Sequence, residues 1–342
     1  MRQIAQPWPS PQRGGRRLVA SGLRARGAER VTLITSPGRA ETALDILGPI
    51  SPTSTVMVDR PHAPTDWLEE LLHVEQTPDW LVAIGGGAVI GVAKAMARRS
   101  RTSICAIPTT YSGSEQTNIW GETEGGQKRT GRDDACRPAW VIYDPELQRD
   151  LPTARARASL VNALAHSVEA LWSTQATARA THAARQSVPL LTEALHGERR
   201  GASPRALEAA CLGAAFAGIA LDGAQMALHH KLAHVVGGAC GTPHAETHAA
   251  LLPHTLRFNG VVCPEVLRLL SESWGSVDPC DLLQRWLRDW GLPASLRELG
   301  VAESQIAELA ELADRRRYAN PRPVTKSDYA EVLTAAWRGS TA

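Results

Sequence analysis

The chain concentrates its histidines in one short stretch. Residues 228–254, LHHKLAHVVGGACGTPHAETHAALLPH, hold six of the eleven histidines in the protein. Neutral imidazoles can ligate a metal, whereas protonated imidazoles beside Lys231 can bind a carboxylate or donate a proton. One such histidine alone is most often a satisfied, partly buried side chain, but six together indicate a functional cluster. They are His229, His230, His234, His244, His248 and His254.

The spacing of these histidines predicts that several of them share helix faces. His230 and His234 are four residues apart on one predicted helix. His244 and His248 have the same spacing if a second helix begins at Pro243, because proline is favoured at the first helical position. Residues four apart on a helix point to the same side. We therefore expect two histidine pairs on two consecutive helices.

A further polar pair precedes the cluster, in VNALAHSVEALW at residues 161–172. Asn162 stands four residues before His166, so the two side chains share a face of a predicted helix. A carboxylate at position 162 would make half of a metal site, but an amide brings no charge and is a poor ligand for a divalent ion. The pair by itself is more often structural than functional.

The elements that must position these residues fall into two kinds. The first 150 residues alternate apolar, β-branched runs with helical patterns, which predicts a parallel sheet with helical crossovers. Beyond Leu151 the chain is rich in Ala and Leu at helical spacing, with an interruption near Gly218–Gly223 and with Pro253 and Pro264 expected at turns or helix starts. The predicted fold is an α/β dinucleotide-binding domain over 1–150 and an all-α domain over 151–342. The expected strands are 30–36, 54–59, 79–87, 102–110 and 139–147.

Two loops follow strands of the predicted sheet. IGGGAVIG, residues 84–91, leads from a strand into a helix, where glycines let the backbone approach a pyrophosphate. It is not GxGxxG, so a tight strand–helix turn explains it equally well. PTTYSGSEQTNIWG, residues 108–121, is rich in hydroxyls and follows another strand. Because both strand ends would face one crevice, we favour cofactor binding there.

Composition excludes several other classes of protein. With 21% charged residues and a net charge of +2, the 342-residue chain offers no general affinity for nucleic acid. The six cysteines lack CxxC spacing, which indicates reduced thiols in a cytoplasmic protein. No apolar run is expected to reach the length of a membrane span.

From about residue 30 onward the chain closely resembles maleylacetate reductases, a branch of the iron-containing (group III) alcohol dehydrogenase superfamily. The motifs occur in the order of that family, and the closing RRYANPRPVT at 316–325 fits the same branch. The resemblance implies the dehydroquinate synthase-like fold, with an α/β coenzyme domain, a helical domain and an active site in the cleft between them. It also implies a homodimer that reduces maleylacetate to 3-oxoadipate with NADH or NADPH in aromatic compound catabolism. The motifs are AIGGGAVIG, PTTYSGSEQTNIWG, KRTGRDDACRPAWVIYDPEL, VNALAHSVEALW, ALHHKLAHVVGG and PHAETHAALLPH.

The same resemblance bears on a metal. Metal-dependent relatives hold their ion with one Asp and three His, and the Asp position is Asn162 here. The matching histidines are His166, His234 and His244, and the remaining superfamily histidine falls near His230 or His248. Asn at that position is similar to other maleylacetate reductases, so the resemblance implies that no metal is required. If an ion were bound, His166, His234 and His244 would be its ligands.

The implied site residues follow from the motifs. Lys231, His234 and His244 stabilise negative charge, with His166 and His230 nearby as further catalytic candidates, and the choice of proton donor stays open. Tyr111, Asn162, His248 and Arg322 are candidates for substrate contact. Arg39, with no acidic residue immediately beside it, is expected to tolerate a 2′-phosphate, so that NADPH is accepted as well as NADH. The expected cofactor-binding residues are Ser36, Pro37, Gly38, Arg39, Gly85, Gly86, Gly87, Ala88, Thr109, Thr110, Ser112, Thr117 and Lys128.

Three departures keep alternatives open. The glycine turn ends in Ala88 where the family commonly has Ser, the N-terminal strand segment is shortened, and the stretch between Thr35 and Asp79 is compressed. A specialised enzyme for a related unsaturated oxo-acid, a metal-dependent alcohol or aldehyde dehydrogenase, and a non-redox binding protein are the alternatives. Asn162 argues against the metal enzyme, and the retained histidines argue against the binding protein.

Overall fold

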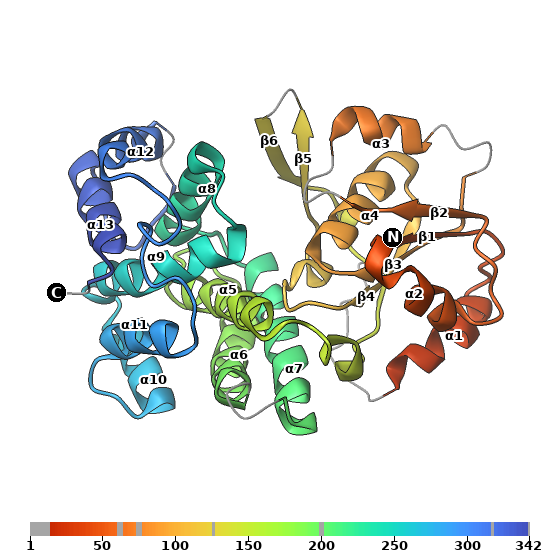
Figure 1. The fold of residues 1–342 in the computed structure, drawn as a ribbon, viewed down its shortest axis with the longest axis horizontal. Coiled ribbons are helices and arrows are strands. Elements are labelled where there is room, and N and C mark those ends of the chain that lie inside the picture. The colour runs from red at the N-terminus through yellow and green to blue at the C-terminus, as the bar shows by residue number, and fades with distance from the viewer. Residues whose placement is uncertain are drawn as a thin grey trace. The chain divides into compact units, whose positions relative to one another are not determined.

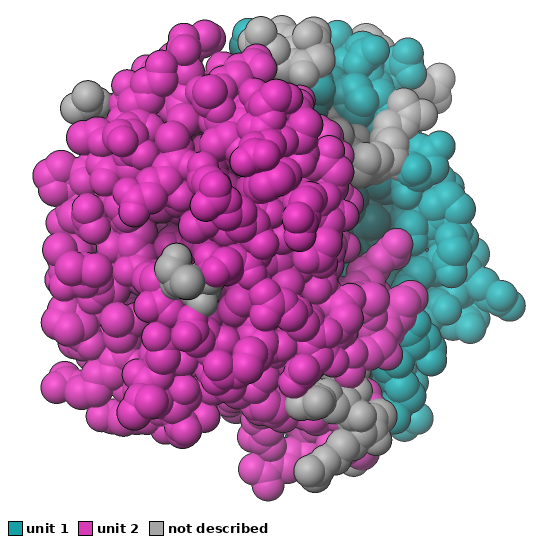
Figure 2. Space-filling model, turned by 60° about the vertical axis from the view of Figure 1, so that its left-hand side comes forward, with its two compact units in different colours: residues 1–150, 207–215 teal, residues 151–206, 216–342 magenta. Residues whose placement is uncertain are grey.

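The computed structural model describes residues 14–59, 64–72, 77–124, 127–197, 202–315 and 318–340. The chain divides into two compact units, coloured separately in Figure 2. Unit 1 comprises residues 1–150 and 207–215, and unit 2 comprises residues 151–206 and 216–342.

Unit 1 is built on a five-stranded parallel sheet, as the alternating pattern predicted (Figure 1). The strand order is β2-β1-β3-β4-β7, and every pairing is parallel. The last strand has only two residues, because Asp144 and Pro145 begin a 3-10 helix soon after it. The strands are β1 (Val31–Thr35), β2 (Ser54–Met57), β3 (Trp80–Gly85), β4 (Ser103–Pro108) and β7 (Trp140–Val141).

Helices cover both faces of this sheet, which explains why its central strands are almost wholly apolar. Leu33 and Val82 pack into a core with α1 (Val19–Ala25) and α2 (Ala40–Leu47). Their neighbours Ile34 and Ala83 point to the other side. There they pack with α3 (Thr65–Leu72) and α4 (Gly87–Ser100).

An antiparallel hairpin in unit 1 was not expected from the sequence. It consists of β5 (Ile119–Glu124) and β6 (Gln127–Arg132), and it forms a sheet of its own. Glu122 on β5 accepts hydrogen bonds from Arg98 and Arg99 of α4, and the Arg98 guanidinium lies over the Trp120 ring. The hairpin depends on these contacts with α4, which the polar sequence of its strands does not disclose.

Unit 2 is helical in its described residues (Figure 1). The interruption expected near Gly218–Gly223 is confirmed, because α7 ends at Asp222 and α8 begins at Leu228. Pro264 occupies the first position of α10 as expected, whereas Pro253 lies inside α9, so the expectation of a turn there is wrong. The helices of unit 2 are α5 (Thr153–Trp172), α6 (Ala178–Gly197), α8 (Leu228–Cys240), α9 (His244–Gly260), α10 (Pro264–Trp274), α11 (Pro279–Asp289), α12 (Ile306–Asp314) and α13 (Lys326–Arg338). Helix α7 (Pro204–Asp222) is divided between the units, because its residues 207–215 belong to unit 1.

Helix α7 corrects a second expectation. Its 19 residues, with a mean hydropathy of 1.3, are long and apolar enough to cross a membrane by length and composition. In this protein 67% of that stretch is buried inside the fold, as in the core helix of a soluble protein. Seven of its residues are Ala, and its N-terminus is capped by the Ser203 hydroxyl on the Ala206 N–H.

One apolar core of unit 2 lies between α8, α9, α12 and α13. Leu232 and Val236 of α8 pack with Ala250 and Leu251 of α9 against α12 and α13. Helix α9 also contacts α5. Helices α5, α8 and α9 carry seven of the eleven histidines of the chain.

Candidate active site

Six histidines from three helices of unit 2 form one continuous cluster, called here the histidine cluster. Ring centroids lie 5.1 Å apart for His166 and His230, 4.7 Å for His230 and His248, and 4.5 Å for His244 and His248. His234 lies 6.1 Å from His244, and both predicted pairs are on one helix each. The cluster comprises His166 of α5, His229, His230 and His234 of α8, and His244 and His248 of α9.

The histidine cluster runs from solvent into the core. His234 and His244 are exposed, whereas His166, His229, His230 and His248 are buried. Burial penalises the charged imidazole, and so the pKa values of His166 and His248 lie well below their ordinary value, with neighbouring histidines adding to the effect. An anion that approaches from solvent therefore meets the exposed His234 and His244 before the buried histidines.

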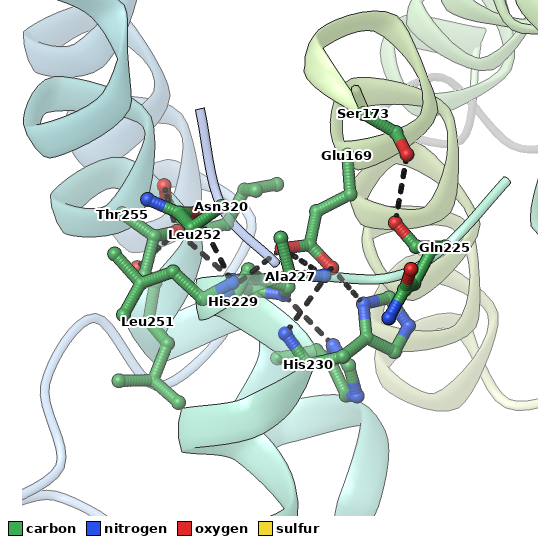
Figure 3. Close-up of polar contacts among 12 residues, drawn as sticks. Glu169, Ser173, Gln225, Ala227, His229, His230, Leu251, Leu252, Thr255 and Asn320 are labelled. Carbon is green, nitrogen blue, oxygen red and sulfur yellow. Dashed lines mark hydrogen bonds and ion pairs between the residues drawn. The ribbon is translucent and has the colours of Figure 1, made fainter. Parts of the chain in front are cut away.

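Glu169 of α5 anchors the buried end of the cluster. Its carboxylate accepts hydrogen bonds from the backbone N–H groups of Ala227, His229 and His230 at 2.8–3.3 Å, at the N-terminus of α8 (Figure 3). It also accepts from Nδ1 of His230 at 2.5 Å. Burial alone would raise the pKa of Glu169, but the His230 ring and these amides hold it below its ordinary value. A buried carboxylate thus stays ionised directly behind His230.

A second hydrogen-bonded chain runs behind His248. Nδ1 of His248 lies 2.8 Å from Nε2 of His229. Nδ1 of His229 lies 3.0 Å from the hydroxyl of Thr255 (Figure 3). The Thr255 hydroxyl donates to the carbonyl oxygens of Leu251 and Leu252, at 3.2 Å each. Burial lowers the pKa of His229 to about 3. The hydrogen-bonded series from His248 through His229 to Thr255 therefore contains no charged group at neutral pH.

Four buried polar atoms on α5, α8 and α9 have no hydrogen-bond partner among the residues that the structure describes. They are Asn162 Oδ1, His166 Nδ1, His230 Nε2 and His248 Nε2. Buried polar groups in folded proteins are almost always satisfied, so this set indicates a place for a bound molecule. The predicted pair Asn162 and His166 is brought to the cluster, as its spacing indicated.

The donor set at this place does not fit an iron ion. Asn162 supplies a neutral oxygen, and the nearby carboxylate of Glu169 is taken up by backbone amides and His230. Over the residues that the structure describes, no three His, Cys, Asp or Glu side chains are grouped so that they could hold one metal ion. Imidazole is a suitable ligand for iron, but this set offers no free carboxylate to balance the charge of a divalent cation.

Two cationic candidates outside the histidines have different surroundings. Lys231 is buried on α8, and its Nζ lies 4.8 Å from the centroid of the Tyr318 ring. Arg322 stacks over Phe258 at 3.9 Å, donates to the Phe258 carbonyl and lies 3.7 Å from an Asp328 oxygen. These contacts correct the expectation that Arg322 closes over a carboxylate of the substrate, because its guanidinium is already engaged.

The predicted cofactor residues of unit 1 meet at one edge of the sheet. The chain passes from β1 to β2 on one side and from β3 to β4 on the other, so β1 and β3 flank a topological switch point. Open α/β sheets bind ligands at such points, outside the carboxyl ends of the strands. Residues 36–39 follow β1, the glycine turn follows β3, and residues 109–112 follow β4.

The glycine turn is shaped by the loop after β4. The Thr109 N–H donates to the Gly85 carbonyl at 3.0 Å. A Cβ on Gly86 would lie 2.9 Å from a Thr110 methyl carbon, and one on Gly85 would lie 2.5 Å from a Val89 methyl carbon. Glycine is required because α4 and the hydroxyl loop approach the turn so closely. Ala88 is the second residue of α4, so its N–H belongs to the free first turn of the helix.

Two unit 1 candidates, Thr117 and Tyr111, are placed differently from the expectation, and a third, Lys128, is not described in its side chain. The Thr117 hydroxyl is buried and accepts from Lys94 Nζ at 2.8 Å, which corrects its assignment to the cofactor. Lys94 also donates to the carbonyls of Ser114 and Ile119, so it organises the hydroxyl loop from behind. Tyr111 is 1% exposed, which does not support direct contact with substrate. Lys128 is on β6, and its side chain lies outside the described part.

Sequence reasoning missed two residues that the structure adds to the site, Glu169 and Thr255, and it did not foresee the contacts of His229. A signal was present for both missed residues. Glu169 is seven residues after Asn162, and Thr255 is seven after His248, so each continues a helix face already singled out. His254, by contrast, lies apart from the cluster, where burial and the charges of Arg257 and Arg288 lower its pKa to about 4.

Comparisons with known proteins agree with this architecture. Residues 13–145 match the family model described as iron-containing alcohol dehydrogenase, and residues 156–337 match that of the Fe-containing alcohol dehydrogenase family, C-terminal. Maleylacetate reductase 1 of Cupriavidus pinatubonensis is 40% identical over 320 residues, which are 92% of this chain and 90% of the relative. The maleylacetate reductase of Pseudomonas knackmussii is 38% identical with the same coverage.

A solved structure extends the similarity to the fold. The crystal structure of maleylacetate reductase from Agrobacterium tumefaciens superimposes with a TM-score of 0.91 at 34% identity. The match covers 98% of this chain and 100% of that one.

Proposed function

This chain belongs to the maleylacetate reductase branch of the iron-containing alcohol dehydrogenase family, and we propose that it reduces maleylacetate to 3-oxoadipate with NADH or NADPH. The observation that carries the proposal is the histidine cluster. It joins exposed imidazoles to buried, unpartnered polar atoms, and its donor set does not suit a metal ion.

The sheet edge of unit 1 is the proposed coenzyme site. Gly85–Ala88 would hold the pyrophosphate of the coenzyme, because the first N–H groups of α4 and the helix dipole stabilise negative charge there. Thr110 and Ser112 line the turn from the neighbouring loop. Ser36–Arg39 receive the adenosine ribose, and Arg39 accommodates a 2′-phosphate. Residues 1–150 are the proposed coenzyme domain, and residues 151–342 supply the substrate site.

Maleylacetate makes specific demands on the substrate site. It carries two carboxylates, and hydride addition to its conjugated double bond places negative charge on the ketone oxygen as an enolate. Such charge must be met by preorganised donors or cations. Lys231 and the exposed His234 and His244 supply them, while Asn162 and the inner histidines contact the reacting part of the substrate.

Steady-state oxidation of NADH and NADPH by the purified protein with maleylacetate tests this proposal, with 3-oxoadipate identified by mass spectrometry. We expect turnover with both coenzymes and formation of one 3-oxoadipate per coenzyme oxidised. Binding of coenzyme without turnover would direct the search to a related unsaturated oxo-acid. Activity confined to alcohols or aldehydes and dependent on an added divalent ion would favour the metal-dependent branch, and failure to bind either coenzyme would exclude a reductase.

Assembly and location are further parts of the proposal. The family resemblance implies a homodimer, and light scattering on the purified protein checks this. All six cysteines are free thiols, as befits a reducing, cytoplasmic setting.

A further inference from the structure

Lysine is rare in this chain, and one buried lysine lies beside the histidine cluster. Of the 37 Lys and Arg residues only four are lysines, at positions 94, 128, 231 and 326. The two side chains are not interchangeable, because the ammonium is a compact point charge on a flexible stem and the guanidinium is a broad planar fork. Lys231 is 5% exposed on α8 and stands three residues before His234, so the two are neighbours on the helix surface. A compact cation is thus buried next to the exposed end of the cluster.

The lysine side chains that the structure describes are held in three different ways. The ammonium of Lys94 donates hydrogen bonds to the hydroxyl loop, and that of Lys326 is exposed and pairs with Glu311. Nζ of Lys231 lies 4.8 Å from the centroid of the Tyr318 ring. An aromatic face attracts an ammonium through the ring quadrupole without cancelling its charge, whereas a carboxylate cancels it. The contact with Tyr318 therefore orients this cation without neutralising it.

The chain around Tyr318 is anchored to two helices of the histidine cluster. Asn320 Nδ2 donates to Asn259 Oδ1 at 2.8 Å, and Asn259 Nδ2 donates back to Asn320 Oδ1 at 3.0 Å. Asn259 belongs to α9 and is fully buried. The Asn320 oxygen also accepts from the Leu228 N–H at 3.4 Å, at the first turn of α8 (Figure 3). Because Tyr318 is only two residues before Asn320, these bonds limit how far its ring can move away from Lys231.

A second anchor follows at Arg322. Its guanidinium lies over the Phe258 ring at 3.9 Å and donates to the Phe258 carbonyl at 3.3 Å. Phe258 and Asn259 are consecutive on α9, so one helix fixes the segment from Tyr318 to Arg322 at two points. The Tyr318 ring is thereby placed before any ligand arrives, and binding does not have to order it.

We propose that Tyr318 is a positioning residue that holds the Lys231 ammonium in place for a carboxylate of the substrate. An unrestrained lysine side chain has many rotamers, and ordering it only on binding would weaken affinity. The ring restricts Lys231 beforehand. This inference deepens the proposed reduction of maleylacetate and rests on it, because a dicarboxylate needs a fixed cation that a neutral alcohol or aldehyde does not. Tyr318 thus contributes to the preference for an anionic substrate.

The substitution Tyr318→Leu tests the inference, with Tyr318→Phe as the matched variant. Leu keeps an apolar side chain beside the ammonium but removes the ring quadrupole, whereas Phe keeps the ring and loses only the hydroxyl. We expect KM for maleylacetate to rise by about tenfold in Tyr318→Leu and to stay within about twofold of the parent in Tyr318→Phe. The value of kcat should change by less than about threefold in Tyr318→Leu, because the ring acts on binding through Lys231. An equal rise of KM in both variants would overturn the inference.

A double-mutant cycle separates action through Lys231 from a general effect on the fold. In Lys231→Met the cation is already absent, so adding Tyr318→Leu should raise KM by less than about twofold. In Lys326→Met, which removes an exposed lysine, adding Tyr318→Leu should still raise KM by about tenfold. The same tenfold rise in both backgrounds would show that Tyr318 acts independently of Lys231 and would overturn the inference.

NMR of the lysine side chains tests the contact without turnover. Protein labelled with 13C at the lysine Cε gives four ε-methylene signals, and that of Lys231 is the one lost in Lys231→Met. The face of an aromatic ring shifts nearby protons upfield. We expect the Lys231 signal upfield of that of Lys326 in the parent and in Tyr318→Phe, but not in Tyr318→Leu. Coincident Lys231 and Lys326 signals in the parent would overturn the inference.

Adipate distinguishes failure of the inference from failure of the proposed function. It is a dicarboxylate of the same chain length as maleylacetate, without the ketone and the double bond. In the complex with coenzyme we expect adipate to shift the Lys231 signal, with a Kd about tenfold higher in Tyr318→Leu. A Lys231 signal that does not respond to adipate would overturn the inference. The expected response in a protein that fails to reduce maleylacetate would refute the proposed function and support the role of Tyr318.

Discussion

The sheet edge of unit 1 and the histidine cluster of unit 2 achieve binding by opposite means. At the sheet edge, residues without side chains leave backbone N–H groups open, and Gly85 and Gly86 are required because α4 and Thr110 approach within contact distance. In the cluster, most of the imidazoles are buried, and they form hydrogen bonds with one another and with Glu169. Binding at the sheet edge depends on room for the ligand beside the backbone, whereas binding at the cluster depends on polar and charged side chains. The two regions should therefore respond to different substitutions.

The largest effect is expected from filling space at the sheet edge. In Gly85→Ala the new methyl would lie 2.5 Å from a Val89 methyl carbon, so the first turn of α4 must move away from the strand. We expect the dissociation constant for NADH, measured by fluorescence titration, to rise by about 100-fold, because displaced amides lose the phosphate. In the control Gly91→Ala nothing lies within 4 Å of the new methyl. Equal affinities in both variants would contradict a backbone-built site.

A smaller effect is expected from removing charge at the cluster. Lys231→Met keeps the length of the side chain beside Tyr318 but loses the cation. We expect KM for maleylacetate to rise by about 10- to 100-fold, since a buried charge pair contributes about 1.5–3 kcal/mol. Coenzyme affinity should stay the same. Lys326→Met, which removes an exposed cation paired with Glu311, is the control and should leave KM unaltered.

The substitution Arg39→Asp should lower the preference for NADPH over NADH by about tenfold. This residue follows β1 at the switch point, and Arg39→Asp replaces a cation with an anion that repels a 2′-phosphate. The ratio of kcat/KM for NADPH to that for NADH should fall, chiefly through KM for NADPH. A ratio that does not change would place the ribose elsewhere.

The smallest effect concerns stability in acid. Burial holds the pKa of His254 at about 4 and that of His229 at about 3 in the fold, against about 6.5 in the unfolded chain. Below pH 6.5 these two histidines bind protons in the unfolded chain but stay neutral in the folded protein. The free energy of unfolding therefore falls as the pH drops toward 4. Each such histidine contributes up to about 1.4 kcal/mol per pH unit.

Urea unfolding between pH 7 and pH 5 measures this slope. His254→Gln removes one buried imidazole outside the cluster, so its stability should fall less steeply with acid than that of the parent. Identical slopes would mean that His254 is not held neutral.

The contrast between the two regions also explains what the sequence could reveal. β1, β3 and β4 are continuous apolar runs, so they can be recognised as strands from their own residues alone. The glycine turn is visible as three consecutive glycines. The spacing of His230, His234, His244 and His248 placed them correctly on two helices. Such features are local, and period or composition suffices to find them.

What escaped prediction depends on contacts far along the chain. The β5–β6 hairpin is stabilised by Arg98 and Arg99 of α4 on Glu122, and no strand-like alternation marks it. Pro253 is tolerated inside α9, against the rule that proline ends a helix. Glu169 caps α8 from 58 residues away, and only the fold brings it behind His230.

The most direct test of the charge-built cluster is turnover by metal-free protein. The protein would be treated with a strong chelator, its metal content measured, and NADH and NADPH oxidation followed with maleylacetate. We predict full activity without bound metal, because Asn162, the histidines and Lys231 provide donors and protons rather than a cation site. Activity lost with the metal and restored by a divalent ion would contradict this and make the histidines ligands.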